Sequence, residues 1–76
     1  MNKDIEKIID VANKLVRTGR AGGSTSERIA AAFVLNRMAY LPSGYEDVVV
    51  AWDRLDTWQH YVRPIRVQHM DRIEGF

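Results

Sequence analysis

The first helix that the sequence predicts lies between residues 3 and 18, where apolar side chains recur three and four positions apart. Charged and amide side chains fill the positions between them, as expected for a helix that buries one face. Gly19 predicts the end of this helix, because glycine adopts the left-handed backbone conformation at little steric cost. The apolar positions of the buried face are Ile5, Ile8, Ile9, Ala12, Leu15 and Val16.

A glycine-rich stretch, Gly19 to Phe33, follows this helix and has the general look of a phosphate-binding loop. It lacks the lysine of a Walker-type loop and the glycine spacing of a dinucleotide-binding turn, and a helix precedes it instead of a strand. Ser24 and Glu27 have the spacing of a capping box, in which each side chain accepts a hydrogen bond from the other residue's amide. We interpret the stretch as a hinge and a helix cap, with weak anion binding by free amides as the alternative.

The second helix is predicted over residues 25–40 and is apolar on most of its surface, which is typical of a helix at the centre of a bundle. Its run of three alanines is expected to let neighbouring helices approach closely. Pro42 and Gly44 then interrupt the chain. The capping-box spacing from Ser43 to Glu46 predicts that a third helix begins near Gly44.

The third helix, predicted over residues 45–62, contains three consecutive valines, which by themselves would also suit a buried strand. The longer window favours a helix, because its apolar side chains share one broad face. Val50 and Tyr61 fall on the polar side of the same wheel. The residues of the expected buried face are Tyr45, Val48, Val49, Trp52, Leu55, Trp58 and Val62.

Pro64 is expected to stop or kink the third helix near Arg63, because proline lacks the amide proton of the helical hydrogen bond. A short fourth helix is therefore predicted over residues 64–73, with its apolar residues toward the core. The tail, residues 74–76, is expected to fray. The apolar residues of the fourth helix are Ile65, Met70 and Ile73.

These elements predict an all-α fold, a compact bundle of three to four helices in a single domain over residues 1–76. A chain of 76 residues forms one modest core, and a deep enzyme cleft is not expected. With no cysteine, a disulfide framework, a thiolate nucleophile and a cysteine-ligated zinc site are excluded. Because the start of the chain lacks the apolar core of a signal peptide and no apolar run could span a bilayer, we expect a cytoplasmic protein.

Few residues suggest a catalytic or metal-binding site. Asp56 and His60 are one helical turn apart, as metal ligands can be, and His69 follows further along. Three ligands must converge to form a catalytic metal site, and such helix pairs often arise by chance, so we interpret all three as surface residues. Serines occur mainly at predicted caps, and no base has a recognisable spacing from them. We expect no catalytic residue, no metal and no cofactor.

The C-terminal basic segment is the more informative surface. Arg63, Arg66, His69 and Arg72 recur every third residue, so on one helix they would form a slanting cationic band close to Tyr61. Arginine beside aromatic rings is enriched at protein interfaces and also suits nucleic acid. A solvated face is the third alternative, in which nearby carboxylates pair with the arginines. The formal net charge of +1 and the interleaved acidic residues make nucleic acid the weakest of the three.

One resemblance extends over about residues 8 to 60. The apolar helix Ile29 to Met38, the pair Gly44-Tyr45 and the run Val50-Ala51-Trp52-Asp53 resemble small proteins of unknown function in proteobacterial and phage genomes. This resemblance carries no catalytic residue. It implies a phage or mobile-element accessory protein that binds a host protein.

The sequence as a whole favours a noncatalytic module that binds a host protein or complex and no membrane, with Tyr61 and the basic residues of the segment as contacts. The first alternative is a small nucleic-acid-binding regulator that uses the same residues. The second is a self-associating domain, in which Val50, Trp52 or Trp58 is exposed on the monomer and buried in a homodimer.

Overall fold

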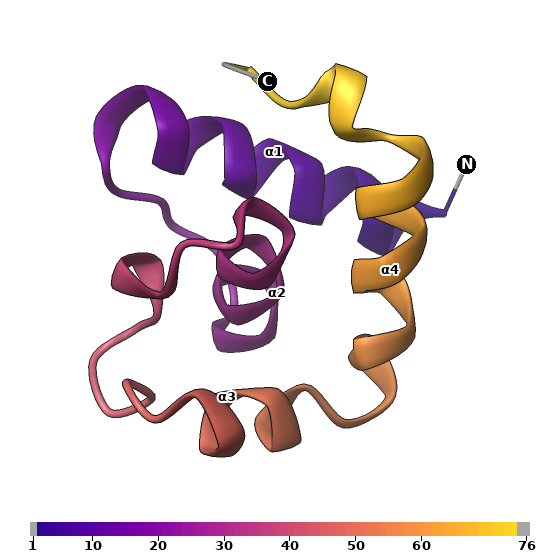
Figure 1. Ribbon diagram of the computed structural model, residues 1–76. Helices are drawn as coiled ribbons and strands as arrows, with labels where there is room; N and C mark the ends of the chain where they lie inside the picture. Colours follow the sequence, from indigo (N-terminus) through magenta and orange to yellow (C-terminus); the bar gives the residue numbers. More distant parts are fainter. Residues whose placement is uncertain (1, 75–76) are drawn as a thin grey trace.

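The computed structural model describes residues 2–74 of this protein (Figure 1). All the regular secondary structure in this range is helical, and loops join the helices. This confirms the predicted all-α bundle. The four α-helices are α1 (Lys3–Thr18), α2 (Thr25–Leu35), α3 (Val48–Leu55) and α4 (Gln59–Gln68), and three short 3-10 turns are η1 (Met38–Tyr40), η2 (Asp56–Trp58) and η3 (Met70–Arg72).

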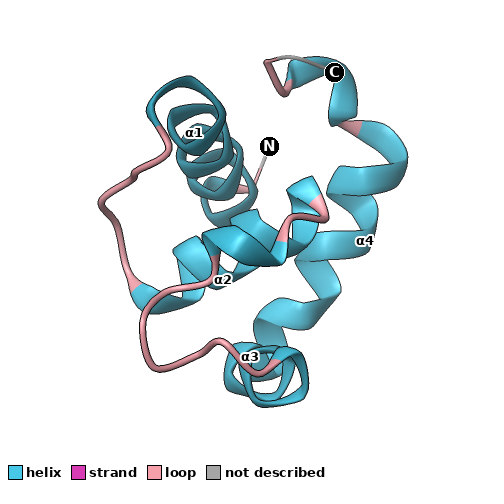
Figure 2. Cartoon of the chain, turned by 60° about the vertical axis from the view of Figure 1, so that its left-hand side comes forward, coloured by secondary structure: helices cyan, strands magenta, loops and turns pink. Residues whose placement is uncertain are grey.

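The central element is α2, as predicted. Figure 2 shows it between α1 and α3, with α4 alongside. Its three alanines, residues 30–32, are fully buried together with Ile29 and Val34. Because a methyl group takes little space, the backbones of α1 and α4 can approach this helix closely, and the alanines contribute to packing.

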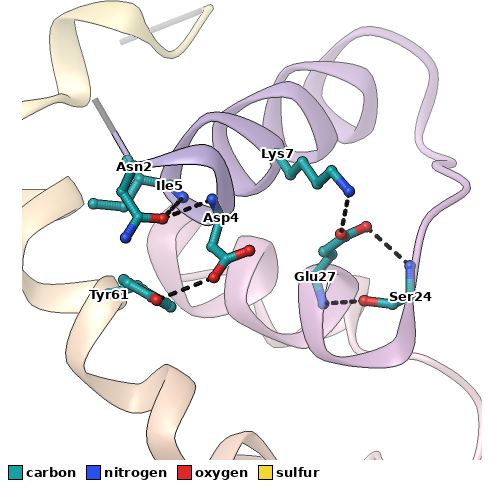
Figure 3. Close-up of polar contacts among 7 residues, drawn as sticks. All are labelled: Asn2, Asp4, Ile5, Lys7, Ser24, Glu27 and Tyr61. Atoms are coloured by element: carbon teal, nitrogen blue, oxygen red, sulfur yellow. Dashed lines mark hydrogen bonds and ion pairs between the residues drawn. The ribbon is translucent and has the colours of Figure 1, made fainter.

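The first helix and its cap agree with the sequence. Asn2 caps α1 by accepting hydrogen bonds from the amides of Asp4 and Ile5, and Gly19 ends it at φ 76°. At the start of α2, Ser24 Oγ accepts from the Glu27 amide at 3.1 Å, and Glu27 Oε1 accepts from the Ser24 amide at 3.0 Å (Figure 3). The predicted capping box is confirmed.

The second helix ends five residues earlier than the predicted boundary at residue 40. Asn36 adopts a left-handed conformation at φ 55°, and the amides of Asn36 and Arg37 donate to carbonyls of the last turn. Asparagine tolerates this conformation better than most residues and so can close a helix. The prediction missed the signal because it gave weight only to Pro42 and Gly44.

The prediction of one helix over residues 45–62 is wrong at both ends. Asp47, rather than Ser43, caps α3, because its Oδ1 accepts from the amides of Val49 and Val50 at 2.9 and 3.2 Å. At the other end Asp56, with φ 51°, breaks the helical path after one short helix. The chain then turns through η2 into α4, so that α3 and α4 lie along two different sides of α2 (Figure 1).

The expected buried face of the third helix is also wrong in part. Ala51 and Leu55 are the buried residues of α3, whereas Val48, Val49 and Trp52 are exposed. The face of α3 that meets the core is centred on Ala51, which the predicted face left out, and the break at Asp56 separates this helix from Trp58 and Val62. The two halves of the predicted helix therefore meet the core with different faces.

Pro64 neither stops nor bounds a helix, which corrects the predicted break near Arg63 and the fourth helix over residues 64–73. It lies inside α4, which ends at Gln68. Val62 and Ile65 are buried on either side of it. The burial of these two side chains stabilises α4 and offsets the backbone hydrogen bond that Pro64 cannot donate.

The C-terminal segment is fastened to α1. The Asn13 side chain donates to the Arg72 carbonyl at 3.1 Å and accepts from the Glu74 amide at 2.7 Å, while Ile73 between them is buried. Arg17 Nε donates to Glu74 Oε2 at 2.7 Å. The expectation of fraying is therefore wrong for Glu74, and the rest of that tail, residues 75 and 76, lies outside the described residues.

Candidate functional site

The predicted cationic band does not form one surface, because its members point to different elements. Arg66 Nη1 donates to the carbonyl oxygen of Val34 at 3.0 Å, at the end of α2. Arg72 lies beyond the end of α4 and donates from both terminal nitrogens to the Glu6 carboxylate of α1, at 2.6 and 2.9 Å. Both guanidinium groups thus hold helices together.

Tyr61 and His69 also make contacts within the folded chain. The Tyr61 hydroxyl donates to Asp4 Oδ2 at 3.1 Å and links α4 to the first turn of α1 (Figure 3). The Tyr61 ring packs edge-on against Trp58 and against the core. His69 is half-buried at the end of α4, where its amide donates to the Ile65 carbonyl.

Arg63 is the predicted contact residue with the most open setting. Its side chain is exposed and makes no hydrogen bond or ion pair with another residue in the described range 2–74. With His60, Pro64, Val67 and Gln68 it lines a shallow, mainly apolar depression of about 370 Å³ on α4. Val67 is 69% exposed at its edge.

The exposed side of α3 carries Val48, Val49 and Trp52, which the predicted buried face included, although the self-association alternative already named Trp52 as exposed. Val49 is 68% exposed, and Val48 and Trp52 flank it. Residues three and four apart are neighbours on a helix, so these three side chains form one patch, the α3 apolar face. The Trp52 ring meets Phe33 of α2 edge-on, with ring centres 5.0 Å apart. The helix packs on the core through Ala51 and Leu55, so this face is left exposed.

The strongest ionic contact is the pair formed by Glu6 and Arg72. The hydrogen bonds from Arg72 hold the pKa of the Glu6 carboxyl below its usual value, and the same bonds raise the pKa of Arg72. Both side chains are partly exposed, so solvent screens the attraction. The pair fixes the position of the C-terminal segment.

Within the described residues, no three histidine, aspartate or glutamate side chains gather closely enough to hold a metal ion. The three predicted surface residues Asp56, His60 and His69 therefore do not form a cluster. No helix of the described chain has the length and apolar character needed to cross a membrane.

Comparison of the chain with known proteins identified no relative. No family model, no curated protein and no solved structure matches the chain.

Proposed function

We propose that this chain is a noncatalytic protein-binding module, and that the α3 apolar face is its main contact surface. The supporting observation is the exposure of Val48, Val49 and Trp52 on a helix of eight residues. β-Branched side chains are poor helix formers, and in the free chain Val48 and Val49 still leave 44% and 68% of their surface in water. A partner that covers them would supply the missing burial, roughly 1.5–3 kcal/mol for a fully buried valine.

Of the contact residues predicted from the sequence, this proposal keeps Arg63 as a free contact. Arg63 keeps its role because it is exposed and unpaired among the described residues. Tyr61, Arg66 and Arg72 already bond to α1 or α2, so a partner would have to compete for them. The same internal bonds weigh against nucleic acid, because they leave less free cationic charge for phosphates.

The setting of this function rests on the sequence resemblance alone. In a phage or mobile-element accessory protein of the cytoplasm, the partner would be a host protein, and binding would alter its activity without a reaction on the small chain. The physical argument needs only a partner with an apolar patch that matches the α3 apolar face.

A pull-down from nuclease-treated bacterial lysate tests the proposal with a matched pair of variants. Val49→Asp places a charge in the α3 apolar face, in a first turn where a carboxylate suits the helix dipole. Val67→Asp makes the same change at a valine of equal exposure on α4. We expect one stoichiometric protein that Val49→Asp loses and that Val67→Asp, at the secondary surface beside Arg63, still captures. Equal capture by both variants would exclude the α3 apolar face.

Self-association is the second candidate function, because Trp52 and Val50 are exposed on the monomer, at 36% and 51%. Trp58, the third residue named for this alternative, is partly buried against the core. A symmetric dimer would bury the same apolar face twice. Sedimentation equilibrium distinguishes the two functions: a dimer that Val49→Asp dissociates supports self-association, and a monomer at high concentration rules it out.

A further inference from the structure

A second hollow of the surface lies on the side where the glycine-rich stretch leaves α1. This cleft, about 320 Å³, is lined by the end of α1 and the following linker, by α2, and by the segment from Ala39 to Ser43. Leu15, Leu41 and Pro42 are its buried apolar residues. The volume is at the lower end of the range of small-molecule sites.

Two arginines line this cleft, and no acidic residue does. Arg20 comes from the linker after α1 and Arg28 from the first half of α2. Neither guanidinium makes a hydrogen bond or an ion pair with another residue of the described chain. Both side chains therefore have free hydrogen-bond donors to offer an anion that enters the cleft.

The other polar groups of the lining suit an oxyanion. Tyr40 and Ser43 line the same cleft, and a hydroxyl can donate to an anion's oxygen. Arginine's planar fork matches the oxygens of phosphate and carboxylate. A phosphate monoester carries about −1.5 to −2 charges at neutral pH and so balances two guanidiniums, whereas a carboxylate leaves one uncompensated.

We propose that this cleft binds a small phosphate monoester, with Arg20 and Arg28 on the phosphoryl group and Leu41 and Pro42 against an apolar body. The sequence analysis assigned the glycine-rich stretch to a hinge and a cap, and that assignment stands, because Ser24 and Glu27 bond to each other. The new site uses the arginines on either side of the cap. It lies apart from the α3 apolar face and does not rest on the proposed protein-binding function.

The test is a titration of the ¹⁵N-labelled chain with phenyl phosphate, followed by the amide signals of Gly19, Ala21 and Ser43. We expect saturable shifts and tighter binding than for inorganic phosphate or benzoate. Affinity should rise as the pH increases through about 6, where the monoester loses its second proton. Shifts that never saturate, or benzoate that binds as well as phenyl phosphate, would overturn the proposal.

Variants assign the binding to the two arginines. Arg20→Gln and Arg28→Gln should each weaken phenyl phosphate about tenfold or more, as expected for the loss of a charged hydrogen-bond donor. Arg37→Gln is the control, since Arg37 is exposed and does not line the cleft. Equal weakening by this control would show general charge attraction and contradict the site.

Because Arg28 is partly buried, its glutamine variant needs a check of folding by circular dichroism. Arg28→Lys keeps the charge and the stem and loses only the planar fork. If the glutamine variant unfolds, the lysine variant decides: weaker binding in a folded chain supports the site, and unchanged binding excludes a forked contact from Arg28.

Discussion

Arg66 donates a hydrogen bond from Nη1 to the carbonyl oxygen of Val34, 32 positions earlier in the chain. The last carbonyls of a helix lack intrahelical donors, and a cation is favourable at that end of the helix dipole. Arg66 therefore caps α2 from outside and ties α4 to the central helix. A residue that the sequence marked as a surface contact is a structural connection in the folded chain.

Replacement of Arg66 should therefore lower stability. We expect Arg66→Gln to reduce the free energy of unfolding by about 1 kcal/mol, since it removes a charged donor from partly buried carbonyls. Urea denaturation followed by circular dichroism measures the change. Arg63→Gln on the same helix serves as control and should stay within about 0.5 kcal/mol of the parent chain. Equal effects of the two substitutions would show that the bond to Val34 contributes nothing.

Among the glycines of the described residues, Gly23 is the one whose replacement should cost most. Its φ is +105°, and a Cβ at this position would stand 2.7 Å from Glu27 Oε1 and 3.3 Å from Val11 Cγ2. Gly23→Ala should destabilise the chain by about 1–3 kcal/mol, through backbone strain and loss of the capping box. Gly22→Ala is the matched control, because a Cβ there has open space. A thermal shift assay that finds both variants equally stable would contradict this assignment.

The start of α3 gives a test of the corrected cap. Asp47→Ala should cost about 1 kcal/mol, because its carboxylate accepts from two amides of the first turn. Ser43→Ala should have no measurable effect, since its side chain takes no part in this cap. If Ser43→Ala were the more damaging substitution, the helix would begin where the sequence spacing placed it. Guanidinium denaturation of both variants measures the difference.

The Glu6–Arg72 pair predicts a dependence of stability on pH. Arg72 lowers the pKa of Glu6 in the folded chain below its ordinary value of 4.5. A carboxyl with a lowered folded pKa contributes stability above its unfolded pKa and loses it as the pH falls through the folded one. Glu6→Gln should thus be less stable than the parent at neutral pH, and the two should converge once the pH has fallen below the lowered folded pKa of Glu6. A gap that persists in acid would contradict the ionic origin of the contact.

The sequence predicted the helices best where each end had a local signal. Gly19 and the Ser24–Glu27 box act within one helical turn, and the apolar spacing marks the start of α1, so the bounds of α1 and the start of α2 could be found from the sequence. Asn36 and Asp56 change the chain direction through a positive φ, which other asparagines and aspartates in this chain do not adopt. Their backbone conformation depends on packing, and the sequence pattern did not reveal it.

The candidate surfaces were harder to predict for the same reason. A periodic row of arginines becomes one surface only if a single straight helix carries it, and α4 ends at Gln68, before His69 and Arg72. The α3 apolar face is exposed because α3 packs through Ala51 and Leu55, and the wheel of the longer predicted helix did not place the core there. The cleft of Arg20 and Arg28 needs the segment around Pro42 folded against the end of α1, which no local spacing indicates.

The clamp by Asn13 has a consequence for the order of folding. Its bond to the Glu74 amide joins residues 61 positions apart, and the entropy cost of this closure is small only when the helices between them are already packed. The C-terminal segment should therefore dock after the transition state for folding. Asn13→Ala would then speed unfolding and leave the folding rate nearly unchanged. This one side chain thus affects the lifetime of the folded chain more than the rate at which it forms.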